Sequence, residues 1–139
     1  MEKKLKGSRS WSRILAIQAL YQINLNKHSK YKLVIKDLLN NKETKKKADD
    51  SFFSKLVIET IKNEKKLINK LLTVTGKNKF QKMEVLIKVI LKLGTCELLF
   101  FKNIPSNASI SEYTKASSSF LSKKEVGLIN GILDKISKS

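Results

Sequence analysis

The chain has 139 residues, of which 41% are hydrophobic, and its 29 Lys and Arg residues against 12 Asp and Glu residues give a formal net charge of +17. This size predicts a single domain over residues 1–139 with a proper core, and the one cysteine excludes an internal disulfide. The charged start MEKKLKGSRS lacks a secretory pattern and no apolar run is long enough to cross a bilayer, so we expect a cytoplasmic protein without membrane association.

One proline and five glycines among abundant Leu, Ile and Lys favour an all-α fold, read as a string of helices. The first predicted helix begins near Ser8 or Ser10, either of which suits an N-cap, and it ends within residues 24–27. Residues 1–10 form a basic N-terminal arm before it. The spacing in YKLVIKDLL predicts a short amphipathic helix over 31–39, followed by the polar loop NNKETKKKADD.

The middle of the chain carries the strongest helical patterns. From Asp50 or Ser51, apolar residues at helical spacing predict one long helix, or two with a break near Asn63, that ends at Gly76. The segment 83–101 is apolar on more than one side and therefore predicts a central helix buried by its neighbours.

The last part predicts two further helices. Pro105 interrupts the chain, and Ser109-Ile110-Ser111-Glu112 has the spacing of a capping box that opens a helix toward Phe120. After a turn at 122–124, the closing helix contains VGLINGILDKI. Its Gly127 and Gly131 each cost a helix about 1 kcal/mol relative to alanine, so we interpret them as positions where a neighbouring backbone approaches closely.

The residues for catalysis are scarce. The chain has one histidine, His28, and one cysteine, Cys96, which cannot form a clustered metal site. Neither a phosphate loop of the GxxxxGK[ST] type nor a dinucleotide GxGxxG motif occurs. We therefore expect no enzyme activity, no cofactor and no bound metal.

The positive charge suits a polyanion such as nucleic acid, although a Lys-rich composition can also follow from the base composition of a genome. Lys62, Lys66 and Lys70 repeat every four residues and would either follow a phosphate backbone or form an ordinary solvated helix face. At the N-terminus, basic residues surround Trp11, which would either stack on a base or anchor the first helix. These candidate RNA contacts are Lys3, Lys4, Lys6, Arg9 and Arg13.

Four segments in this order resemble the NusB family of bacterial transcription antitermination factors. They are AIQALYQ, IKVILKLGTCELLF, NIPSNASISEYTKASSSF and LINGILDKI. The resemblance covers nearly the whole chain, and the segments lie at the distances found in that family.

The resemblance implies a compact bundle of about six to seven helices in two packed subdomains. It further implies that the protein binds single-stranded boxA-type RNA of nascent ribosomal RNA transcripts together with NusE, a protein of the small ribosomal subunit. The pair would help to load an antitermination complex onto RNA polymerase. The resemblance adds Gln18 and Tyr21 to the predicted RNA contacts. By position in that family, it also places the contacts with the partner NusE at Tyr21, Lys88, Lys92, Lys124 and Leu128.

The chain departs from the family pattern at several places. Its arginine-rich segment is thin, and Ile87, Lys92 and Cys96 stand where glutamate, arginine and tyrosine are usual. These departures put the transfer of single residue roles in doubt more than the resemblance itself. Two other functions stay open: a basic helical protein that binds RNA without sequence preference through its net charge, and a fragment of a ribosomal RNA cytosine methyltransferase, a class in which NusB-like domains form the N-terminal part. The oligomeric state, monomer or homodimer, also stays open.

Overall fold

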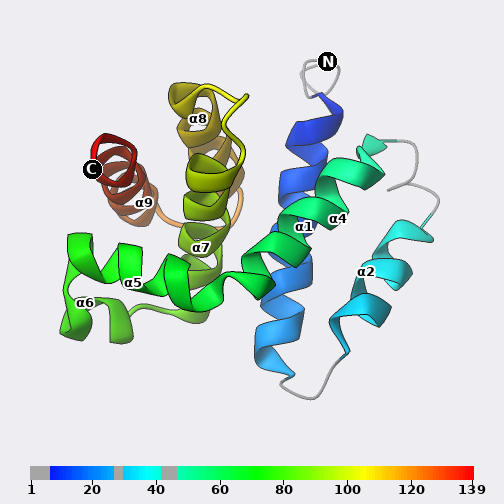
Figure 1. Cartoon of the computed structure of the whole chain (residues 1–139), viewed down its shortest axis with the longest axis horizontal. Coiled ribbons are helices and arrows are strands. Elements are labelled where there is room, and N and C mark those ends of the chain that lie inside the picture. The colour runs from blue at the N-terminus through cyan, green and yellow to red at the C-terminus, as the bar shows by residue number, and fades with distance from the viewer. Residues whose placement is uncertain (1–6, 27–29, 42–46) are drawn as a thin grey trace.

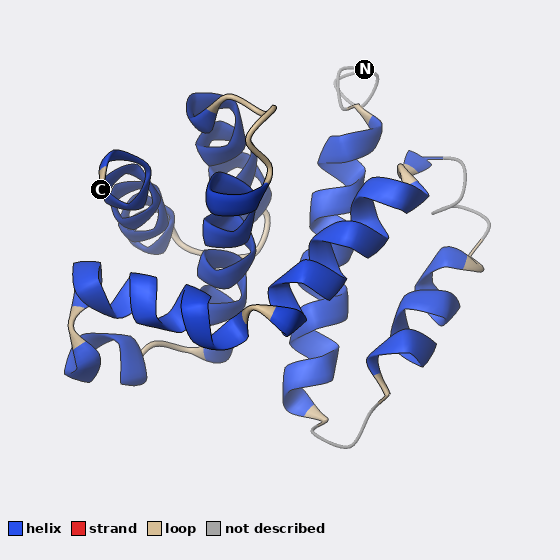
Figure 2. Ribbon diagram, in the orientation of Figure 1, coloured by secondary structure: helices blue, strands red, loops and turns tan. Residues whose placement is uncertain are grey.

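The computed structural model describes residues 7–26, 30–41 and 47–139, and this part of the chain contains helices and no strands (Figure 2). The all-α prediction is confirmed. The helices are α1 (Ser8–Leu25), α2 (Tyr31–Leu39), α4 (Asp50–Lys62), α5 (Glu64–Thr75), α6 (Lys77–Gln81), α7 (Val85–Phe100), α8 (Ser106–Ser117) and α9 (Lys123–Lys138).

Helix α7 occupies the centre of the molecule, where it contacts α1, α4, α5, α8 and α9. In Figure 1, α1, α2 and α4 form one group on the right, and α5, α6, α8 and α9 surround α7 on the left. Helix α1 packs against α2 and α4 and also against α7 and α8. The N-terminal helix is therefore held by both groups.

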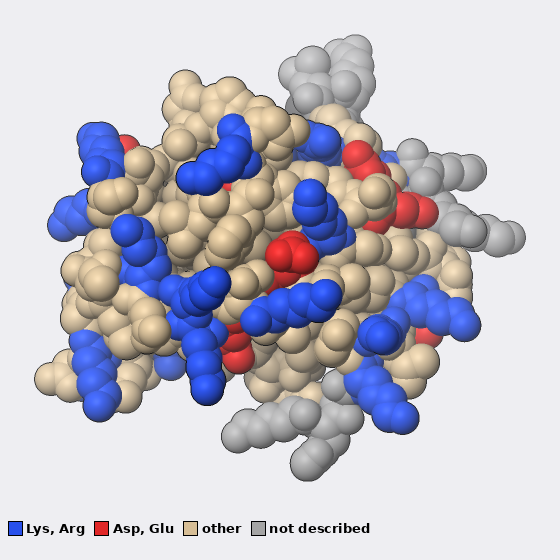
Figure 3. Space-filling view, in the orientation of Figure 1, with Lys and Arg blue, Asp and Glu red and all other residues tan. Residues whose placement is uncertain are grey.

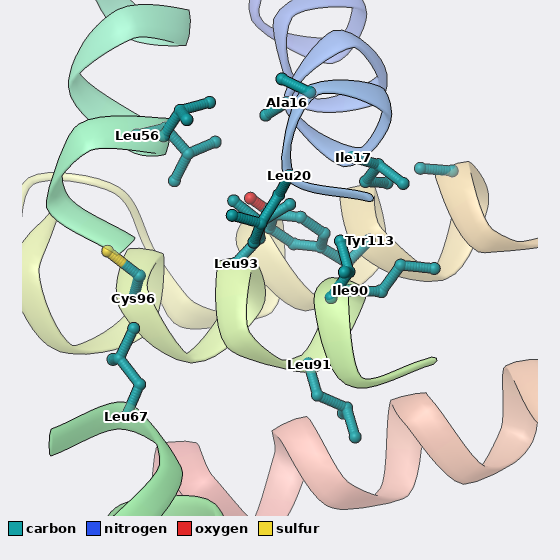
Figure 4. Packing of buried hydrophobic residues seen from close by; sticks show 14 of the residues in the cluster. Ala16, Ile17, Leu20, Leu56, Leu67, Ile90, Leu91, Leu93, Cys96 and Tyr113 are labelled. Carbon is teal, nitrogen blue, oxygen red and sulfur yellow. The ribbon is translucent and has the colours of Figure 1, made fainter. Parts of the chain in front are cut away.

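The core forms around α7 as the sequence predicts, because positions 89–97 are all buried. Figure 4 shows Leu91 pointing toward α9, and Leu67 of α5 pointing toward Cys96. Burial raises the pKa of the Cys96 thiol to about 11, so this cysteine is protonated at neutral pH. None of the described helices is both long and apolar enough to span a membrane.

Most predicted helix boundaries hold. The break falls at Asn63, between α4 and α5, and α5 ends at Gly76, whose φ of 82° is the left-handed conformation that glycine adopts without strain. Asp49 caps α4 by accepting the Phe52 backbone N–H. The short helix α6 was not predicted, since its five residues carry too little periodicity.

Two predicted caps are wrong. Helix α1 has Gly7 rather than Ser8 or Ser10 at its N-cap. Helix α8 begins at Ser106 after Pro105, so Ser109 lies inside the helix. A capping box does occur, but at the start of α9, where Ser122 and Glu125 exchange hydrogen bonds.

The glycine prediction for α9 is also wrong. Gly127 and Gly131 are exposed, and a Cβ added at either would meet no atom within 4 Å. The close approach lies instead at Gly94 of α7, where a Cβ would come within 2.9 Å of the Leu133 methyl carbons. It is therefore Gly94 that lets α9 pack closely on α7.

We expect Gly131→Ala to raise the free energy of unfolding by about 0.5–1 kcal/mol, because alanine is the better helix former and the added methyl group meets open space. Gly94→Ala makes the same helical gain, but its methyl group must displace the fully buried Leu133, which costs about 1–3 kcal/mol. Denaturant unfolding of both variants measures the difference. Equal stabilisation by the two substitutions would contradict this assignment.

Candidate nucleic-acid interface

The N-terminal end of α1 is fastened to α4 and α8. The Ser10 hydroxyl donates to the Glu112 carboxylate of α8. The Ser12 hydroxyl accepts the backbone N–H of Asp49, which precedes α4, at 2.8 Å. The first turns of α1 are therefore fixed both to the start of α4 and to α8.

Arg13 lies in the interior, with only 5% of its side chain exposed. Its Nε and Nη2 atoms donate to the Glu97 carboxylate at 2.9 and 2.6 Å. Ser109 and Tyr113 of α8 donate to the same carboxylate at 2.6 and 3.0 Å. A second carboxylate, that of Glu112, lies 3.6 Å from Nη1. This cluster joins α1, α7 and α8.

The charges in this cluster support one another. Burial alone would lower the pKa of Arg13, but hydrogen bonds to Glu97 and its negative charge outweigh burial and raise that pKa above its usual range. Burial, together with the charge of Glu97, raises the pKa of Tyr113 well above its usual range. The prediction that Arg13 contacts RNA is corrected accordingly: its guanidinium is enclosed and already paired.

Unlike Arg13, Arg9 faces solvent, with half of its side chain exposed. Its guanidinium lies 4.8 Å from the centre of the Phe52 ring and 3.9 Å from an Asp49 carboxylate oxygen. It lines an open hollow of about 230 Å³. The other residues of this hollow are Asp49, Ser51, Phe52, Lys55, Phe101, Asn103 and Ile104.

The hollow beside Arg9 adds residues that the sequence could not place. Lys55 and Asn103 belong to α4 and to the loop before α8, and only the fold brings them to the end of α1. An arginine, a lysine and an amide around one open hollow suit a phosphate group and a base edge.

Gln18 and Tyr21 are exposed on one face of α1, and Tyr21 is 37% exposed. Arg9 precedes Gln18 by two and a half helical turns, which places the two side chains on opposite sides of α1. The structure thus divides the predicted RNA contacts between two surfaces. Trp11 is half-buried, and the Lys47 ammonium lies 4.8 Å from its ring centre. Lys3, Lys4, Lys6 and His28 lie outside the described residues.

The predicted partner contacts also separate. Lys124 is exposed and Leu128 half-buried on α9. Lys88 is half-buried and donates to the Gln81 carbonyl oxygen at 3.1 Å. Lys92 is 5% exposed, and its ammonium lies 3.0 Å from the Glu64 carboxylate. The prediction of Lys92 as a partner contact is corrected, since its side chain is buried and its charge is already paired with Glu64.

The model of the NusB family matches residues 10–138. The transcription antitermination protein NusB of Rickettsia bellii (strain OSU 85-389) is 34% identical over 142 residues, covering 94% of this chain and 90% of that protein. NusB of Rickettsia felis (strain ATCC VR-1525 / URRWXCal2) is 30% identical over 148 residues, covering 95% of this chain and 92% of that protein.

Solved structures share the fold. NusB of T. maritima superimposes with a TM-score of 0.83 at 22% identity over 96% of this chain and 93% of its own. The NusB chain in a crystal structure of antitermination factors NusB and NusE with dsRNA gives 0.80 at 18% identity, over 94% of this chain and 96% of its own. The helices, the family match over nearly the whole chain and the curated relatives agree: this chain belongs to the NusB family.

Proposed function

We propose that this protein is a transcription antitermination factor that binds boxA-type RNA of nascent ribosomal RNA transcripts together with NusE. In this role it helps to load an antitermination complex onto RNA polymerase in the cytoplasm. The observation that carries the proposal is the match of residues 10–138 to the NusB family. Curated relatives bear the name transcription antitermination protein, and one structural relative is bound to NusE and dsRNA.

The protein acts in this proposal by binding, without catalysis and without a cofactor. The alignment with the R. bellii relative covers 94% of this chain and 90% of that protein, which bears the name transcription antitermination protein. This favours the antitermination role over the methyltransferase alternative. The net charge of +17 supplies the general attraction to RNA.

The proposed contacts follow the exposed side chains. Arg9 and its hollow form one RNA contact, and Gln18 and Tyr21 form another on the opposite side of α1; Lys3, Lys4 and Lys6 stay predicted contacts. A partner surface includes Tyr21, Lys88, Lys124 and Leu128. Arg13 and Lys92 are withdrawn because both are buried and paired.

We expect Arg9→Ala to weaken binding of a boxA-like single-stranded RNA about tenfold, because a half-exposed guanidinium beside an open hollow supplies one charged RNA contact. The free energy of unfolding should change by less than about 1 kcal/mol, since the ion pair with Asp49 is long and exposed. Fluorescence titration of labelled boxA-like and scrambled RNAs measures the affinities.

The matched control is Lys36→Ala, which removes one exposed positive charge from α2. This variant should weaken the binding of both RNAs less than Arg9→Ala does. Identical losses for the two variants would show that Arg9 acts only through net charge. Equal affinity of the wild-type protein for both RNAs would leave the alternative of binding without sequence preference.

A further inference from the structure

Four lysines follow the outer surface of α4 and α5. Lys55 and Lys62 of α4 and Lys66 of α5 are exposed, and Lys70 of α5 is half-buried. We refer to Lys55, Lys62, Lys66 and Lys70 as the lysine track. Figure 3 shows basic side chains, with a few acidic ones between them, over the face where Figure 1 places α4 and α5.

Helix geometry aligns the members of the lysine track. Lys55 and Lys62 are two turns apart on one face of α4, and Lys66 and Lys70 are one turn apart on α5. Where the two helices meet, Lys62 and Lys66 line a single open hollow of about 410 Å³. Its other lining residues are Ile61, Asn63, Glu64 and Lys65. The positive charges thus converge at the junction and continue along both helices.

The carboxylates nearest in sequence do not neutralise the track. No ion pair within the described residues involves Lys55, Lys62, Lys66 or Lys70. Glu64 pairs with Lys92 at 3.0 Å, and Glu59 accepts a hydrogen bond from the Asn63 side-chain amide at 3.3 Å. Glu59 keeps its negative charge in that hydrogen bond, but the four lysines of the track outnumber Glu59 and Glu64, so the surface keeps an excess of positive charge.

The track begins where the N-terminal contact ends. Lys55 lines the same hollow as Arg9. A strand held at Arg9 can pass from this hollow to Lys55 and then along α4 to the junction with α5. Its phosphates would neutralise the lysines in turn.

Charge without apolar anchors fits a phosphate backbone better than a protein. The large apolar side chains that the described residues expose are Tyr21, Leu25, Leu33, Val85, Phe100 and Phe120, and none of them belongs to α4 or α5. A protein interface takes most of its affinity from such anchors, whereas phosphate contacts require only positioned charge.

We propose that the lysine track binds the sugar-phosphate backbone of single-stranded RNA that extends beyond the segment held at Arg9, without regard to sequence. This inference rests on the proposed RNA-binding function and adds a second surface to it. The track lengthens the contact and contributes salt-dependent affinity, whereas discrimination between sequences stays with the surfaces of α1.

The test compares two variants that lose the same charge. One is Lys62→Gln with Lys66→Gln and Lys70→Gln. The control is Lys32→Gln with Lys36→Gln and Lys135→Gln, three exposed lysines on α2 and α9. Each variant is titrated at salt concentrations from about 0.05 to about 0.3 M. Three RNAs are compared: a boxA-only RNA, and a boxA-like and a scrambled RNA that carry the same single-stranded extension.

The track variant should bind both extended RNAs roughly 10- to 100-fold more weakly near 0.1 M salt, and its slope of log K against log salt should fall by about 2, because each lost single-strand phosphate contact removes about 0.7. The preference for boxA over scrambled RNA should persist, and the boxA-only RNA should lose less affinity. The control should keep most of the wild-type slope. Circular dichroism and denaturant unfolding should match the wild type for both variants.

Equal losses of RNA affinity and of salt slope in the track variant and the control would overturn the proposal. A track variant that weakens binding of a partner protein but leaves the salt slope for RNA intact would also overturn it. Failure of the proposed function gives a different result: the wild-type protein would then bind boxA-like and scrambled RNAs equally, while the salt slopes still decide whether the track binds RNA.

Discussion

Glu97→Ala is expected to lower the free energy of unfolding by about 3–5 kcal/mol, the cost of breaking a buried ion pair. The Glu97 carboxylate is fully buried and accepts hydrogen bonds from Arg13, Ser109 and Tyr113. Its removal leaves the Arg13 guanidinium in the interior with the longer ionic contact to Glu112 at 3.6 Å and with the aromatic rings of Phe52 and Tyr113. Denaturant unfolding measures the change.

Two controls separate the ion pair from its surroundings. Tyr113→Phe removes one neutral donor to the carboxylate and should cost about 1–2 kcal/mol. Asp37→Ala removes an exposed carboxylate from α2 and should change stability by less than about 0.5 kcal/mol. A loss below about 1 kcal/mol for Glu97→Ala would contradict the account, since it would show that Arg13 reaches water once its partner is gone.

Local patterns were sufficient for much of the fold. Helical spacing predicts α2 and the buried central helix, and it offers a break near Asn63 as one of two alternatives, because each depends on residues within a few turns of one another. The stop at Gly76 follows from a conformation that glycine adopts most easily. These features need no knowledge of which helix packs on which.

Local patterns could not separate Arg9 from Arg13. Both lie in the first two turns of α1 beside serines, and both resemble RNA contacts in the sequence. The difference comes from Glu97, 84 positions away, which meets Arg13 only after α1 packs on α7. The Ser109 hydroxyl donates to the same carboxylate. Ser109 suits a helix cap by its sequence, but in the structure it lies within α8.

The glycines show a similar limit. Gly127 and Gly131 stand in an amphipathic helix, but spacing alone does not reveal that both face solvent. Gly94 lies in an apolar run that gives no hint of a special position, yet it faces Leu133 across the α7–α9 contact. Close approach between helices depends on their mutual orientation, which the sequence pattern does not contain.

RNA and NusE are expected to strengthen each other's binding to this protein. If the protein binds boxA-type RNA jointly with NusE, the affinity for boxA-like RNA should rise at least about tenfold when NusE is present, and the affinity for scrambled RNA should rise less. By thermodynamic linkage, boxA-like RNA must strengthen NusE binding by the same factor. This reciprocity distinguishes joint recognition from two independent charge attractions.

The most direct measurement of the central claim is a titration of labelled boxA-like, scrambled and duplex boxA RNAs with the wild-type protein at near-physiological salt, without and with saturating NusE. We expect the protein to prefer the single-stranded boxA-like RNA and NusE to increase that preference. Equal affinities for the boxA-like and scrambled RNAs under both conditions would contradict it.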